Sequence, residues 1–125
     1  MDDVKTNVEG LRSALSAVLP PKNSSNFLIW TWNLRAFGDL TARWHSEPDD
    51  SPKRDWYAVA FVAEVVARFD MVALQEVRRN TTTLRFLLDQ LGEARRVVVS
   101  DVTEGGPPCG RHATLCRGIP MTDVA

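Results

Sequence analysis

The sequence has only two cysteines, no long apolar run and almost no net charge, and each of these absences excludes a class of protein. Cys109 and Cys116 are separated by six residues, which matches neither a CxxC redox motif nor a usual zinc site, so we expect free thiols. No apolar run approaches the roughly 20 residues that a membrane span needs, and the acidic start does not have the order of a secretory signal. These features predict a cytoplasmic protein without a membrane partner.

The charges of the chain nearly cancel, because 15 lysines and arginines stand against 16 aspartates and glutamates, a formal net charge of -1. This balance argues against a protein that coats polyanions, so a role with nucleic acid has to come from a local site. With 125 residues, of which 44% are hydrophobic, the chain is long enough for one hydrophobic core but has little to spare. We therefore expect one globular domain.

The spacing of apolar residues predicts three helices. The first lies within residues 1–21, where an amphipathic stripe is ended by a pair of prolines. The second is expected to begin at Ser51 as the N-cap, with Pro52 at its first position. A threonine at position 81 or 82 caps the third. The stripe of the first helix consists of Val4, Val8, Leu11, Leu15 and Val18.

Three β-rich segments alternate with these helices, at residues 27–34, 71–77 and 95–102. The first is a continuous apolar run, which favours a strand buried on both faces. The long connection at 35–51 is expected to be exposed and, at this length, functional. Residues 104–125 show neither the apolar period of a helix nor that of a strand, so we expect a poorly ordered tail. The order predicts an α/β domain whose sheet is covered by helices.

Two of the predicted strands end in polar side chains that a purely structural strand does not need. Asn33 ends the first and Glu76 the second, and the carboxyl ends of such strands are where ligands bind in α/β sheets. A carboxylate leaving an apolar strand must meet solvent, a cation of the chain such as Arg78 or Arg79, or a metal ion. Asn33 is either a metal-binding amide or a strand cap. One carboxylate with an amide oxygen is adequate as part of a Mg²⁺ site.

The segments around these two residues carry a recognisable pattern. WTWNLRAFG at 30–38 and FDMVALQEVR at 69–78 are separated by a predicted helix. Together they resemble the first two motifs of the endonuclease/exonuclease/phosphatase superfamily, whose fold is DNase I-like. The second segment matches the signature D-x-V-x-L-Q-E-V. The resemblance implies a four-layer α/β sandwich, in which two helix-backed sheets pack face to face.

The resemblance also implies a chemistry for the strand ends. Family members hydrolyse phosphoesters with a divalent metal, so Glu76 is expected to ligate Mg²⁺ or Mn²⁺, and Asn33 to help hold the metal and the scissile phosphate. Both then count as catalytic residues. The ion acts as a Lewis acid during in-line attack by water. Arg35, Arg78 and Arg79 are weaker candidates for contact with the phosphate of the substrate, which the sequence does not identify beyond a phosphoester such as nucleic acid.

The resemblance covers residues 24–103, which form a partial domain between the N-terminal helix and the divergent tail at 104–125. Later motifs of the family, a strand with a histidine, an Asp-x-Asn and a C-terminal Asp-His pair, have no counterpart here. His45 and His112 lie outside any matching motif and are expected at the surface. We therefore expect a truncated N-terminal portion of the family's domain.

This interpretation of the sequence leads to two hypotheses about function. The first is a metal-dependent phosphodiesterase or nuclease whose isolated chain has little or no activity, because the motifs that activate water are missing. The second is a non-catalytic remnant or interaction module, which self-associates through an exposed sheet surface that its partner sheet does not cover. In that case Trp30 and Trp32 point to the same face of the sheet.

Overall fold

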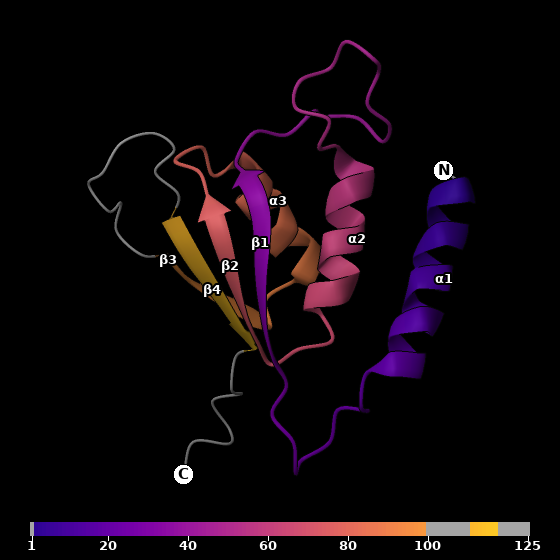
Figure 1. Cartoon of the computed structure of the whole chain (residues 1–125), viewed down its shortest axis with the longest axis vertical. Helices are drawn as coiled ribbons and strands as arrows, with labels where there is room; N and C mark the ends of the chain where they lie inside the picture. The colour runs from indigo at the N-terminus through magenta and orange to yellow at the C-terminus, as the bar shows by residue number, and fades with distance from the viewer. Residues whose placement is uncertain (1, 100–110, 118–125) are drawn as a thin grey trace.

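In the part of the chain that this computed structural model describes, three α-helices and four β-strands make up a mixed α/β arrangement (Figure 1). The structure describes residues 2–99 and 111–117. The helix-strand order expected through the third strand is confirmed. In chain order the elements are α1 (Asp2–Val18), β1 (Ile29–Phe37), α2 (Trp56–Val66), β2 (Met71–Val77), α3 (Thr82–Leu91), β3 (Arg95–Val99) and β4 (Arg111–Arg117).

The N-terminal helix α1 packs against α2, which lies between α1 and the sheet (Figure 1). Its one buried residue is Val4, and the rest of the contact is partly polar: Arg12 forms an ion pair of 2.5 Å with Glu64 of α2. Among the described helices, none combines the length and the apolar character needed to cross a bilayer.

The expected start of the second helix at Ser51 is wrong. Helix α2 begins at Trp56, and its N-cap is Asp55. The Asp55 carboxylate accepts a hydrogen bond of 2.9 Å from the amide of Ala58 and one of 2.7 Å from the amide of Ser46. An aspartate caps as well as a serine does, and this one also anchors the preceding loop, so the helix starts four residues later than predicted.

The sheet has the strand order β1-β2-β4-β3, in which β1 and β2 are parallel and β4 is antiparallel to both of its neighbours. Strand β4 lies in the segment expected to be a poorly ordered tail, so that expectation is wrong for residues 111–117. Seven residues are too few to show a clear strand period. In addition, β4 pairs with β2 and β3, which are separated from each other in the sequence by α3. Residues 100–110 and 118–125, which include Cys109 and the rest of the predicted tail, lie outside the described residues.

The two faces of the sheet differ. One packs on α2 and α3, and its strand residues join the buried core of the molecule. The core residues are Leu34, Phe37, Val59, Val62, Val66, Phe69, Val72, Leu74, Val77, Leu84, Leu87 and Leu115. No described helix covers the other face, which we call the open face. It carries Ile29, Thr31, Met71, Ala73, Arg96, Val98, Thr114 and Cys116.

The expected burial of the first strand on both faces is wrong. Strand β1 stands at the border of the described sheet, with Ile29 and Thr31 exposed on the open face. Trp30 and Trp32 share the helix-facing side, as expected from their spacing. The Trp30 ring packs at a tilt against Phe69, with ring centroids 5.4 Å apart, and Trp32 packs against the core. The apolar run therefore forms a strand with one face packed against the core and one exposed face.

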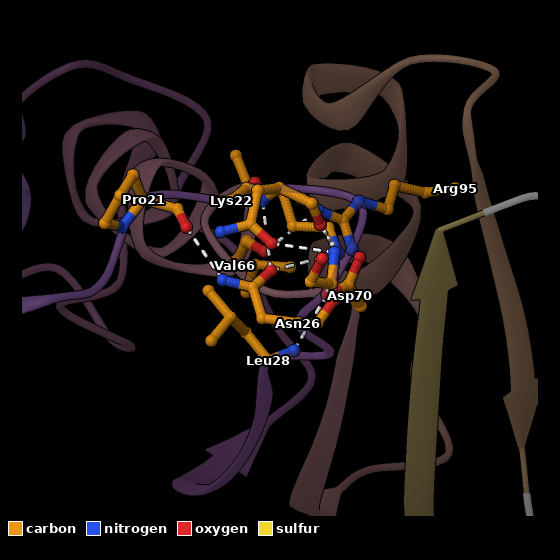
Figure 2. Close-up of polar contacts among 10 residues, drawn as sticks. Pro21, Lys22, Asn26, Leu28, Val66, Asp70 and Arg95 are labelled. Carbon is orange, nitrogen blue, oxygen red and sulfur yellow. Dashed lines mark hydrogen bonds and ion pairs between the residues drawn. The ribbon is translucent and has the colours of Figure 1, made fainter.

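A cluster of polar contacts lies at the end of the sheet where β2 and β3 begin (Figure 2). Asp70 accepts the amide of Leu28 at 2.8 Å and pairs with the Lys22 ammonium at 2.9 Å. The buried Arg95 donates to the carbonyls of Val66 and Ala67, both at 3.1 Å. A guanidinium at the C-terminus of α2 satisfies carbonyls that the helix leaves without partners. This cluster fixes the opposite edge of the sheet from the strand ends that carry Asn33 and Glu76.

The central position of β4 predicts a large effect for Leu115→Ala. Leu115 is fully buried, so its truncation is expected to lower the free energy of unfolding by about 2–5 kcal/mol. Val98→Ala is the control, because Val98 is 68% exposed and its loss is expected to cost no more than about 0.5 kcal/mol. Urea denaturation measures both. Equal, small effects would mean that β4 does not belong to the core.

Candidate metal centre

The parallel pairing of β1 with β2 brings the two predicted site residues into contact. Asn33 pairs with Gln75, so the next residue of β2, Glu76, lies beside the Asn33 side chain. The Asn33 amide group donates from Nδ2 to Oε1 of Glu76 at 2.9 Å. The predicted end of the first strand at Asn33 is wrong, because β1 continues to the buried Phe37, which the sequence placed in an exposed connection. The Asn33 side chain is exposed and Glu76 is partly exposed, so the pair meets solvent near the carboxyl ends of both strands, where the regular pairing stops.

The backbone at this point is strained. The register moves from Asn33 opposite Gln75 to Phe37 opposite Val77, so three residues of β1 stand against Glu76 alone. Arg35, Ala36 and Glu76 have φ values of 47°, 53° and 59°, and in the described ranges no other residue except glycine has a positive φ. A left-handed conformation costs an L-residue about 1–2 kcal/mol. Strain of this kind gathers at functional sites, where the surroundings hold it in place.

The strained segment, residues 34–37, which we call the bulge, directs two amides into the site. The Arg35 amide donates to Oδ1 of Asn33 at 2.9 Å. The Ala36 amide donates to Oε2 of Glu76 at 3.3 Å. Both carboxylate oxygens of Glu76 therefore accept one hydrogen bond from β1, which fixes the carboxylate plane. Each oxygen keeps a further lone pair, since a carboxylate has about four acceptor positions.

The segments that follow β1 and β2 also run close together. The Arg78 amide donates to the carbonyl of Phe37 at 2.8 Å, and the Thr83 hydroxyl donates to the carbonyl of Gly38 at 2.6 Å. A Cβ at Gly38 would lie only 2.6 Å from Cβ of Arg78. Glycine is therefore required here for the close approach of the two chains.

We call the surface formed by Asn33, Glu76 and the bulge the rim. The three predicted arginines lie around it at different depths. Arg35 and Arg79 are exposed and Arg78 is partly buried. The hydrogen bond from Asn33 lowers the pKa of Glu76 below its ordinary value, and the Ala36 amide and the charges of Arg78 and Arg35 add to this, against the opposing effect of desolvation. The carboxylate is therefore ionised at neutral pH. Beside it lies a surface pocket of about 520 Å³, lined by Ala36, Asp39, Ser51, Pro52, Arg78, Arg79 and Asn80.

The donor set suits one part of a magnesium site. Glu76 supplies an ionised carboxylate, and Mg²⁺ commonly takes one or two carboxylates with water and substrate phosphate oxygens as its remaining ligands. The Asn33 amide nitrogen faces Glu76 and the Asn33 oxygen accepts from the Arg35 amide, so in this arrangement Asn33 holds the carboxylate. Within residues 2–99 and 111–117, no three side chains of the types His, Cys, Asp and Glu gather as a metal cluster. A cation at Glu76 therefore depends on water or substrate for much of its coordination.

The other candidates from the sequence lie away from this rim. The His45 ring lies 3.2 Å from the Asp3 carboxylate of α1 and packs at a tilt against the Tyr57 ring. Cys116 is a free, partly buried thiol in β4, as expected. The side chain of His112 lies outside the described residues.

One residue at the rim has no counterpart among the predictions. Arg54, in the loop before α2, reaches the carbonyls of the bulge. No sequence signal points to Arg54, because position 54 falls inside the predicted second helix, beyond the connection at 35–51. A positive charge in a loop is too common to single out, and the contact forms between residues about twenty positions apart.

A comparison with known protein families finds no match for this chain, and a search among curated proteins finds none either. The assignment of function therefore depends on the geometry of the rim and on the motif resemblance.

A pair of glycine substitutions tests the close approach at the rim. Gly38→Ala is expected to destabilise the fold by about 1–3 kcal/mol, because the new methyl group meets the base of the Arg78 side chain. Gly10→Ala is the control: no atom lies within 4 Å of its Cβ position in α1, so the helix is expected to gain up to about 1 kcal/mol. Thermal unfolding distinguishes them. A stabilising effect at both positions would contradict the tight crossing.

The lowered pKa of Glu76 predicts a component of stability that depends on pH. The ionised group stabilises the fold fully above its pKa in the unfolded chain, about 4.3, and this contribution is lost as the pH falls through the lower pKa of the folded state. The difference in melting temperature between the wild type and Glu76→Gln is expected to shrink between about pH 6 and about pH 3.

The control for this titration is Glu93→Gln, which removes an exposed carboxylate in the turn before β3, at the other edge of the sheet. Melting curves that move in parallel for the wild type and Glu76→Gln at every pH would show that Glu76 gains nothing from its contacts with β1.

Proposed function

We propose that this chain carries the N-terminal part of a divalent-metal-dependent phosphoester hydrolase, similar to the endonuclease/exonuclease/phosphatase superfamily. The observation that carries the proposal is the contact between the Asn33 amide and the Glu76 carboxylate at the ends of two parallel strands. The strained backbone of the bulge and of Glu76 supports it. A sheet with helices on one face and an open second face is compatible with one half of a four-layer sandwich.

In this proposal Glu76 ligates Mg²⁺ or Mn²⁺. Asn33 and the Ala36 amide hold the carboxylate in one orientation through its two oxygens. Bound there, a divalent ion supplies Lewis-acid chemistry, polarising a phosphoryl oxygen and offsetting negative charge during attack by water. The Glu76 carboxylate is ionised near neutral pH, so metal binding there needs no deprotonation.

The arginines favour a negatively charged ligand. Arg78 and Arg79 line the pocket beside Glu76, and Arg35 lies on the neighbouring bulge. Two carboxylates, Glu76 and Asp39, stand against the three guanidinium groups, so a bound divalent ion adds to a positive charge that is already present at the rim. A phosphodiester or phosphomonoester fits this charge, since guanidinium groups bind phosphate oxygens with paired hydrogen bonds. Nucleic acid is one such phosphoester.

The same residues are expected to turn over little substrate by themselves. Activation of water requires a titratable group within hydrogen-bond reach of that water. Glu76 is committed to the metal in this proposal, and among the described histidines His45 interacts with Asp3 instead. We therefore propose a chain that binds metal and phosphoester but contributes only part of the catalytic machinery.

Metal binding by Glu76 is tested with Mn²⁺, whose free concentration is followed by electron paramagnetic resonance. The wild type is expected to bind Mn²⁺, and Glu76→Gln to bind it at least about tenfold more weakly, because loss of even a residue that only orients a ligand costs 10–100-fold. Glu93→Gln is the matched control, with one exposed carboxylate fewer at the opposite edge of the sheet. Equal affinities in all three proteins would contradict the proposed metal site.

Cleavage of supercoiled plasmid DNA in Mg²⁺ measures turnover on the same three proteins. Cleavage near background is expected for each. Mg²⁺-dependent cleavage that disappears in Glu76→Gln would support the proposed hydrolase while overturning the expectation of low activity.

A further inference from the structure

Arg54 binds the bulge from the side opposite to Glu76. Its Nη2 atom donates to the carbonyl of Leu34 at 2.6 Å and to that of Arg35 at 3.1 Å, and Nη1 donates to the carbonyl of Ala36 at 3.0 Å. One guanidinium group thus holds three consecutive carbonyls. Two of these belong to the residues with left-handed backbone.

The two sides of the bulge are joined through the same peptide groups. In a planar trans peptide the carbonyl and the amide N–H point in opposite directions. The peptide between Leu34 and Arg35 gives its carbonyl to Arg54 and its N–H to Asn33. The next peptide gives its carbonyl to Arg54 and its N–H to Glu76. Arg54 and the two site residues therefore bind opposite sides of the same two peptides.

Arg54 is itself held firmly. Its guanidinium lies 5.0 Å from the centre of the fully buried Phe37 ring, a cation–π arrangement. Its carbonyl accepts the amide of Thr41 at 2.8 Å, and the next residue, Asp55, is the N-cap of α2. Desolvation lowers the pKa of Arg54, yet an arginine stays charged at neutral pH. The loop between β1 and α2 thus ties the start of α2 to the candidate site.

We propose that Arg54 is a positioning residue of the Glu76 site, which holds the peptides of the bulge so that Asn33 and the Ala36 amide keep the Glu76 carboxylate in its metal-binding orientation. This inference depends on the proposed metal site. Arg54 acts through the bulge, because its guanidinium donates to the carbonyls of the bulge and not to Glu76. A charged donor on the carbonyl also polarises the peptide and strengthens the hydrogen bond from its N–H to the carboxylate.

Lysine is the informative replacement. A guanidinium presents several donors in a rigid planar fork, which here spans three carbonyls, whereas an ammonium concentrates its donors on one atom. Arg54→Lys keeps the charge but loses this span. Arg43→Lys is the matched control, because Arg43 lies in the same connection, is exposed and interacts with Asp50 at 3.5 Å. Arg54→Gln, without the charge, provides a second variant.

Two measurements on the full chain test the proposal. The first is Mn²⁺ affinity by electron paramagnetic resonance. Arg54→Lys and Arg54→Gln are expected to weaken binding by about 10-fold or more, as the loss of a group that orients a ligand does. Arg43→Lys is expected to stay within about twofold of the wild type, because an exposed substitution has little effect. The second is hydrogen exchange of the Arg35 and Ala36 amides, expected to accelerate about 10-fold or more in both Arg54 variants.

The amides of Val72 and Leu74, in the buried centre of β2, report general loss of stability. If exchange accelerates equally there and at Arg35, Arg54 stabilises the whole fold and does not act specifically on the bulge. That result would overturn the proposal. Unchanged Mn²⁺ affinity in both Arg54 variants, with a wild type that binds, would also overturn it while the metal site stands. A wild type that does not bind Mn²⁺ would contradict the metal site, and the exchange of the Arg35 and Ala36 amides then decides whether Arg54 holds the bulge.

Discussion

The parallel pairing of β1 with β2 is the constraint on which the candidate site depends. It places Asn33 opposite Gln75 and therefore beside Glu76, at the point where the regular pairing of the two strands stops. A shift of one residue would turn the Asn33 side chain to the other face of the sheet, because successive side chains alternate. The register is maintained by burial at Leu34 and Val72, which face the helices. The packing of an apolar core thus determines the position of two polar groups.

Around this pairing, the chain maintains a conformation that it would not adopt alone. Three residues with left-handed backbone stand at the rim, and their cost is offset by hydrogen bonds on both sides of the peptide groups. The Arg54 guanidinium supplies the bonds on one side and the Glu76 carboxylate accepts on the other. Opposite charges on the two sides of neutral peptides stabilise the same arrangement without forming an ion pair. The strained segment is consequently part of the fold and of the site at once.

The element order was predictable because periodicity and helix stops are local properties. The stripe that includes Val4 and the apolar run before Gln75 predicted α1 and β2 correctly. Strand β4 was missed because seven residues without a period do not reveal partners that are distant in sequence. The exposure of β1 was missed for a related reason, since an apolar run does not say which layers cover its faces. The start of α2 depended on Asp55, whose carboxylate also anchors Ser46 across a loop.

By itself the sequence determined which polar residues follow the apolar runs of the two strands, because an asparagine or a glutamate after such a run is recognised from the order of residues alone. It also determined that both strands end at one edge, because a helix between them favours a parallel connection. Only the tertiary structure decided the distance of 2.9 Å between them, the left-handed bulge and the reach of Arg54. The physical reason is that backbone strain and charged hydrogen bonds balance only when segments distant in the chain are packed together, and no local pattern records that balance.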